Sequence, residues 1–125
     1  MTGGGSGGME ALLGRAREVG GVKVLGVKTE VADGDALREL AEQLRDRLGD
    51  SIVLVGAEAE GKAQLVLTVA KPLTSRFKAG DLIRPIAAIV GGSGGGRPDM
   101  AQAGGTDVSK LEQAIEALYA GVGAG

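Results

Sequence analysis

The sequence contains no histidine and no cysteine among its 125 residues. Without cysteine the chain can form no disulfide bond, no thiolate metal site and no cysteine nucleophile. Without histidine it lacks the side chain that most often serves as zinc ligand, general base or pH-dependent switch. A catalytic base would have to be a carboxylate or a lysine. We therefore expect a chain that is not an enzyme and that needs no metal or cofactor.

Aromatic residues and long apolar runs are also scarce. Aromatic residues make up 2% of the chain, so the core must be built from leucine, isoleucine, valine and alanine. No apolar run approaches the ~20 residues of a membrane-spanning helix. The N-terminus lacks the basic and then apolar pattern of a secretory signal. These absences favour a cytoplasmic protein with no membrane partner, and the length favours a single domain.

The charges are distributed unevenly, although the net charge is only −2. Residues 30–60 contain nine acidic residues and three arginines, whereas residues 61–98 contain six basic residues and one aspartate. A basic second half favours an anionic partner. The alternative is that both halves present ordinary solvated surface, and composition alone does not decide between them.

The apolar periodicity predicts a single α+β domain in which helices pack on a mixed β-sheet. The expected order is strand Val22–Val31, helix Asp35–Gly49, strand Ser51–Ala59, strand Lys62–Lys71, helix Asp81–Val90, a glycine-rich loop and helix Ser109–Gly121. The two adjacent strands are joined by "EAEGK", which is typical of a hairpin. An antiparallel hairpin beside a strand–helix–strand unit makes the sheet mixed.

Local signals refine these elements. Gly26 indicates a β-bulge in the first strand. Pro85 is compatible with a helix only near its first turn. Ser109 and Glu112 have the spacing of a capping box at the start of the last helix. Each signal is a local prediction that the backbone can test.

The two ends of the chain differ in composition from its middle. Residues 1–8 resemble a flexible linker or tag, and residues 9–20 carry an apolar stripe that indicates the remnant of an upstream helix. Residues 21–122 form the predicted domain, and residues 123–125 form a tail.

The most unusual stretch is "VGGSGGGRPDMAQAGGTD", Val90 to Asp107, which holds seven glycines and one arginine. It is not a phosphate-binding Walker loop, because no lysine–serine/threonine pair follows the glycines. Its backbone N–H groups and the forked guanidinium of Arg97 are suited to bind an anion such as phosphate. Alternatively, the glycines permit close packing of a helix on the sheet, and Arg97 forms a buried ion pair with Asp99 or Asp107. Both interpretations remain open from the sequence.

Three segments, "GGSGGGRPDMAQAGG", "RFKAGDLIRPIAAIVGG" and "IVLVGAEAEGKAQLVLTVAK", resemble the C-terminal domain of bacterial alanyl-tRNA synthetases, which is associated with DHH-type phosphoesterases. The resemblance runs from about Val19 to Val122. Ala103 interrupts an Ala-Gln-Gly-Gly run that is common in the family. Phosphoesterases with this domain usually carry histidine where Arg97 stands, so the arginine favours the synthetase branch.

The resemblance implies that residues 21–122 are a non-catalytic tRNA-binding module that docks on the outer corner of tRNA. The implied partners are tRNA, specifically alanine tRNA, the other domains of the synthetase and, as in some family members, a second copy of the chain. Competing interpretations are a structural or oligomerisation module and the substrate-binding half of a DHH-type phosphoesterase.

Ten residues are the expected RNA contacts. Charged side chains would meet phosphates, Phe77 would be exposed for base stacking, and the glycines would let the RNA approach the backbone. The set is Lys71, Arg76, Phe77, Lys78, Arg84, Gly94, Gly95, Gly96, Arg97 and Gln102. Tyr119, by contrast, is expected in the core.

We expect the purified chain to hydrolyse no nucleic acid, because it lacks histidine, cysteine and any recognisable cluster of metal ligands. The measurement is Mn²⁺-dependent cleavage of short oligonucleotides and cyclic dinucleotides, compared with a blank taken through the same purification. Cleavage above that blank would contradict the prediction.

Overall fold

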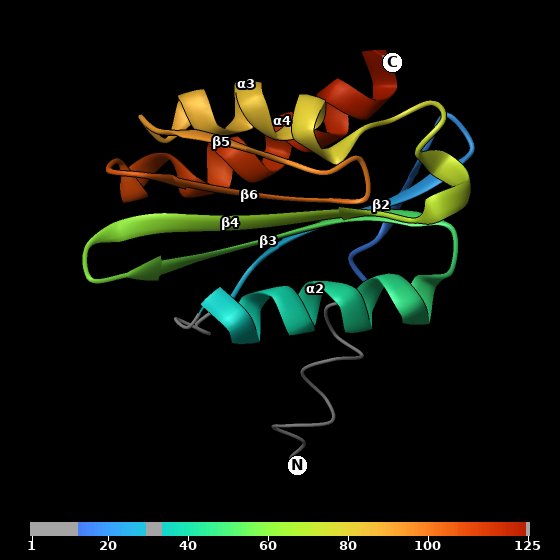
Figure 1. The fold of residues 1–125 in the computed structure, drawn as a ribbon, viewed down its shortest axis with the longest axis horizontal. Coiled ribbons are helices and arrows are strands. Elements are labelled where there is room, and N and C mark those ends of the chain that lie inside the picture. The colour runs from blue at the N-terminus through green and yellow to red at the C-terminus, as the bar shows by residue number, and fades with distance from the viewer. Residues whose placement is uncertain (1–12, 30–33, 125) are drawn as a thin grey trace.

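The computed structural model describes residues 13–29 and 34–124, and within them a six-stranded mixed sheet carries helices on both faces (Figure 1). The strands are β1 (Arg17–Val19), β2 (Val22–Lys28), β3 (Ser51–Ala59), β4 (Lys62–Val69), β5 (Ser93–Gly96) and β6 (Met100–Gly105). The helices are α2 (Gly34–Leu48), α3 (Ala79–Ile89) and α4 (Leu111–Ala124), with short 3₁₀ turns η1 (Lys71–Leu73) and η2 (Val108–Lys110). The predicted α+β fold is confirmed.

The strands follow the order β1-β2-β3-β4-β6-β5, with β2 and β3 parallel and the other neighbours antiparallel. The predicted hairpin between β3 and β4 is confirmed. Its two turn residues, Glu60 and Gly61, have φ of 54° and 78°. Positive φ at both positions is what a two-residue hairpin turn of type I′ requires, and glycine adopts it without a steric penalty.

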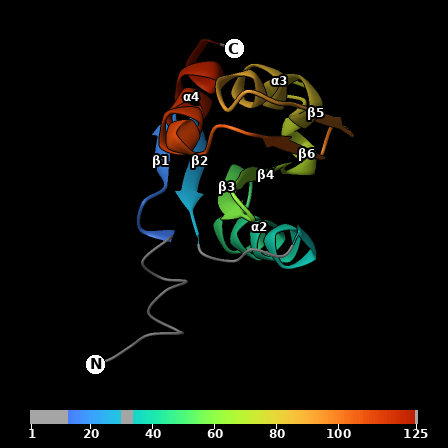
Figure 2. The ribbon, with the colours of Figure 1, turned by 90° about the vertical axis from the view of Figure 1, so that its left-hand side faces the viewer.

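The helices divide the core into two layers. Helix α2 covers one face of β2, β3 and β4, where Leu37, Ala41 and Leu44 are buried. Helices α3 and α4 cover the other face (Figures 1 and 2). The buried cluster on the α2 side includes no residue of β5 or β6. The α2-side face of these two strands therefore extends beyond the helix that covers the rest of the sheet.

The glycine stretch, expected to be a loop between two helices, is instead the β5–β6 hairpin at the edge of the sheet. Ser93 pairs with Gly104 and Gly96 pairs with Ala101. The backbones of Arg97 and Met100 bond to each other at 2.8 and 3.3 Å and close the turn. The prediction failed because glycine is depleted in strands and leaves no pattern of alternating side chains to recognise.

Close packing explains most glycines of this hairpin. A Cβ atom on Gly92 would lie 1.7 Å from the Gly104 carbonyl oxygen, and one on Gly94 would lie 2.4 Å from Ala103 Cβ. A Cβ atom on Gly105 would lie 2.2 Å from the Val90 carbonyl oxygen, just after α3. Such distances are far inside van der Waals contact, so Gly92 and Gly94 are required by the packing of the hairpin against its own strand β6, and Gly105 by the packing of the hairpin against the end of α3.

The N-terminal part of the structure differs from the expected helix remnant. Arg17–Val19 is the edge strand β1, paired antiparallel with β2, and residues 9–12 of the expected helix lie outside the described residues. Gly26 is not a bulge, because it pairs in register with Leu54. A Cβ atom there would lie 2.7 Å from Ile115 Cγ2, so glycine is required by the packing of α4.

Three helix-end predictions are also wrong. Helix α3 begins at Ala79, so Pro85 lies in its interior, where its missing N–H leaves one helical bond unmade. The Ser109 hydroxyl bonds to the Asp107 carboxylate, and α4 begins at Leu111, so Ser109 forms no capping box. The expected tail is helical as far as residue 124.

We expect Gly94→Ala to lower the free energy of unfolding by about 1–3 kcal/mol, because the added methyl group overpacks against Ala103. Gly95→Ala is the matched control on the same strand, since a Cβ atom there meets nothing within 4 Å. Chemical denaturation of both variants checks this, and equal stabilities would refute the packing explanation for Gly94.

Candidate nucleic-acid interface

The tip of the β5–β6 hairpin is fastened to two other elements. The Ala79 N–H, at the start of α3, donates to the Pro98 carbonyl at 2.8 Å. The Val69 N–H, at the end of β4, donates to the Asp99 carbonyl at 3.0 Å. Because β4 leads directly into η1, these bonds place Arg97 in the same region as Lys71.

Arg97 is exposed, and among the residues that the structure describes it forms no ion pair. The predicted buried ion pair with Asp107 is wrong for a geometric reason. Arg97 precedes β6 and Asp107 follows it, so about 20 Å of extended strand separates them. Asp107 instead lies 3.9 Å from Lys110 and accepts a bond from Ser109. The guanidinium of Arg97 is free to meet an external anion.

A hollow of about 560 Å³ lies between the hairpin tip and the C-terminal part of α2. Its charged lining is mixed: Lys71, Arg97 and Arg45 are basic, and Glu42, Asp46, Asp50 and Asp99 are acidic. The acidic residues from α2 and the turn after it oppose an anion inside the hollow. Lys71 and Arg97 therefore favour an anion at the rim on the hairpin side.

Phe77 is not exposed for stacking, contrary to expectation. Its side chain is only 4% exposed and belongs to the core under α3 and α4. The Arg76 guanidinium lies 5.0 Å above the ring, within the range of a cation–π contact. Phe77 thus supports Arg76 from below, while Arg76 itself is at the surface.

The two remaining expected cations lie around the start of α3. Lys78 precedes the helix, is exposed, and donates to the Thr74 carbonyl at 3.3 Å. Arg84 is exposed on the helix, 3.9 Å from Asp81, a surface pair of small energetic weight. The structure therefore gives two groups, one at the hairpin tip with Lys71 and Arg97, and one near α3 with Arg76, Lys78 and Arg84.

Gln102 projects from β6 into a second hollow, of about 320 Å³. Gln64 of β4 and Ser93 of β5 also line it, and neither was expected from the sequence. Gln64 is a polar residue between apolar neighbours on a largely buried strand, which is the signal that could have indicated it. Gly94 and Gly96 face α3, whereas Gly95 lies on the face that Gln102 shares.

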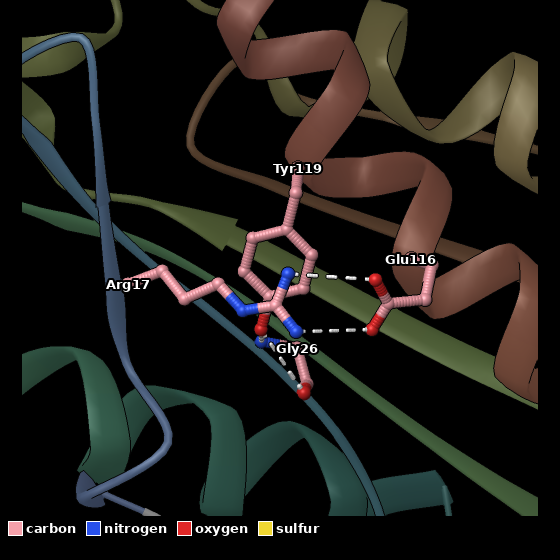
Figure 3. Close-up of polar contacts among 4 residues, drawn as sticks. All are labelled: Arg17, Gly26, Glu116 and Tyr119. Atoms are coloured by element: carbon pink, nitrogen blue, oxygen red, sulfur yellow. Dashed lines mark hydrogen bonds and ion pairs between the residues drawn. The ribbon is translucent and has the colours of Figure 1, made fainter.

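A separate polar cluster joins the opposite edge of the sheet to α4 (Figure 3). The Tyr119 hydroxyl accepts a bond from the Gly26 N–H at 2.8 Å, so this half-buried tyrosine is structural, as expected. The Arg17 guanidinium lies 4.1 Å from the ring centroid and bonds to both Glu116 carboxylate oxygens at 3.4 Å. Because its charge is paired, Arg17 is a poorer phosphate ligand than Arg97.

Among residues 13–29 and 34–124, no helix is long and apolar enough to cross a membrane. The same residues contain no group of three or more acidic side chains placed to hold a metal ion.

Comparisons with known proteins agree with this architecture. The chain is 62% identical over 121 residues to an alanine–tRNA ligase of Sorangium cellulosum, which covers 94% of this chain and 13% of that protein. The crystal structure of the C-Ala domain from Aquifex aeolicus alanyl-tRNA synthetase matches with a TM-score of 0.79 and 28% identity, over 86% of this chain and 97% of that one. A DHH domain from the s1p family of ribosomal proteins shares the fold, at 16% identity and a TM-score of 0.62.

The chain thus spans about an eighth of the length of the ligase that it matches, and nearly all of the solved C-Ala domain. The family model of the DHHA1 domain matches residues 21–123, which include every strand from β2 to β6 and all but the last residue of α4. The chain belongs to the DHHA1 domain family.

Proposed function

We propose that this chain is a non-catalytic tRNA-binding module of an alanine–tRNA ligase, acting in the cytoplasm and docking on the outer corner of alanine tRNA. The observation that carries the proposal is the exposed guanidinium of Arg97 at the tip of the glycine hairpin, which forms no ion pair with any residue that the structure describes. The similarity to ligases and to a C-Ala domain supports tRNA as the anion.

The physical requirements of such docking are met by the residues around the tip. A folded tRNA corner is recognised through its shape, sugars and phosphates. Arg97 and Lys71 supply cations on one side of the tip, while Arg76 and Lys78 supply them beside α3. Rigid placement matters because phosphate contacts fix the register and orientation of the RNA.

The net charge of −2 sets an expectation for affinity. Binding driven by counterion release scales with the number of phosphates that are neutralised. A chain with only five cations in these two groups, one of them 3.9 Å from an aspartate, should bind tRNA weakly by itself. In the ligase, the other domains would bind the same tRNA and raise the overall affinity through effective concentration.

The other domains of the ligase and a second copy of the chain are the further partners in this proposal. The 13% coverage of the Sorangium cellulosum ligase supports the first of these. Light scattering after size-exclusion chromatography, with and without tRNA, separates a tRNA-binding monomer from an oligomerisation module.

We expect Arg97→Ala to weaken tRNA binding while leaving the melting temperature unchanged, because the side chain is exposed and forms no ion pair within the described part of the chain. The slope of log affinity against log salt should become shallower by about one. Arg97→Lys should recover the slope but not the full affinity, since lysine keeps the charge and loses the bidentate geometry.

Lys62→Ala is the matched control for Arg97, because Lys62 is exposed beside the β3–β4 turn, at the opposite end of the sheet. It should change neither affinity nor slope. A loss of melting temperature in Arg97→Ala, with binding intact, would contradict the proposed contact.

Lys71→Ala and Lys78→Ala should each weaken binding by a similar factor for different tRNAs, because phosphate contacts carry no sequence information. Each should also flatten the salt slope by about one. Titration of alanine tRNA and one unrelated tRNA at two salt concentrations tests both effects. Unchanged affinity and slope would mean that the two lysines are merely solvated surface.

A further inference from the structure

The glycines of the β5–β6 hairpin fall into two sets according to the face of the sheet. Those that face α3, such as Gly92 and Gly94, are required because a Cβ atom would collide with the backbone. On the opposite face, a Cβ atom on Gly95 would meet nothing within 4 Å, and one on Gly104 would only touch the Ala63 carbonyl oxygen at 3.5 Å.

Backbone conformation does not require glycine at these two positions either. Neither Gly95 nor Gly104 has a positive φ, so other residues can adopt the same conformation. Glycine in a strand weakens it by about 0.5–1 kcal/mol relative to alanine. The fold alone therefore gives no reason for glycine here, and the usual remaining reason is the close approach of a ligand.

The two glycines lie in a polar part of the sheet that we call the glycine shelf: Gln64, Ser93, Gly95, Gln102 and Gly104. Strand register builds it in two rows. Gly104 lies between Gln64 and Ser93 in one row, and Gln102 lies between Val66 and Gly95 in the next. The shelf borders the 320 Å³ hollow beside the start of α2, and none of the described residues that line that hollow is charged.

This chemistry suits a planar, neutral and polar group. A glutamine amide can both donate and accept hydrogen bonds, as the edge of a nucleobase does. Missing side chains at Gly95 and Gly104 leave the strand backbone open to the face of a ring. A phosphate would find no cation among the described residues that line the hollow, and a paired base would have its hydrogen-bonding edge already occupied.

We propose that the glycine shelf binds an unpaired nucleobase of the RNA, with its face on the backbone at Gly95 and Gly104 and its edge at Gln64 and Gln102. The inference rests on the proposed function, because Arg97 supplies the adjoining phosphate contact. Arg97 follows Gly95 by two residues on the same strand face, about 7 Å along the chain. An RNA strand held at Arg97 by its phosphate therefore brings a neighbouring base over the shelf.

The test is Gly95→Val, which fills the shelf while the open space around Gly95 spares the fold. Binding of tRNA should weaken by about tenfold, the weight of one stacked base, with the melting temperature unchanged. The salt slope should stay that of the wild type, because no phosphate contact is lost. Gly95→Ala, which adds only a methyl group, is the matched control and should weaken binding less.

A second measurement compares hexauridylate with a hexamer of the same sugar–phosphate backbone that carries no bases. The wild type should bind hexauridylate about tenfold more tightly, and both Gly95→Val and Gln102→Ala should abolish that preference. Because Gln102 is exposed, we expect Gln102→Ala to fold, and this variant therefore provides the test if Gly95→Val fails to fold.

Two outcomes would contradict base binding at the glycine shelf. One is equal binding of the two hexamers by the wild type, and the other is a folded Gly95→Val variant that binds tRNA with wild-type affinity. If Arg97→Ala still weakens tRNA binding and flattens its slope, only the shelf fails and the proposed function stands. If Arg97→Ala also has no effect, both fail.

Discussion

The structure around the candidate interface depends on one steric constraint: the β5–β6 hairpin must approach α3 more closely than side chains allow. Even on the helix side a Cβ atom at Gly80 would lie 3.0 Å from the Gly96 carbonyl oxygen. The close approach allows hydrogen bonds at both ends of the helix. The Ala79 N–H bonds to Pro98 at the start, and the Gly92 and Asp107 N–H groups bond to Ala87 and Val90 at the end. An edge hairpin that would otherwise be loose thus becomes a fixed support for Arg97.

Elements with many apolar side chains were predictable, and the glycine hairpin was not. In α2 the leucines recur at helical spacing, and in β4 the residues Ala63, Leu65, Leu67 and Val69 alternate toward the core, as predicted. The β5–β6 hairpin derives its position from backbone pairing and from the absence of side chains, which no pattern of apolar residues can reveal. Strand β1 has only three residues, too few for any period.

The exposure of the expected interface residues was likewise predictable only in part. The basic residues are exposed, as their charge requires, but Phe77 is buried although Arg76 and Lys78 flank it. The burial of Phe77 comes from the path of the chain between η1 and α3. This path directs the aromatic ring into the core, while the side chains of Arg76 and Lys78 remain in solvent. Gln64 was missed because its possible role depends on the neighbouring strand: β6 places Gly104 next to it, in a hollow beside the start of α2.

The two hollows beside α2 differ in the charge of their described lining residues. At the hairpin tip, Glu42 and Asp46 lie across the hollow from Lys71 and Arg97, so repulsion keeps a phosphate out of the interior and leaves it at the rim. In the second hollow the described lining residues are uncharged, so these residues would oppose a neutral base less than a phosphate. The acidic face of α2, which lowers the net charge and the expected affinity, thereby contributes orientation. In the proposed complex it would disfavour an arrangement in which the RNA backbone enters the hollow at the hairpin tip.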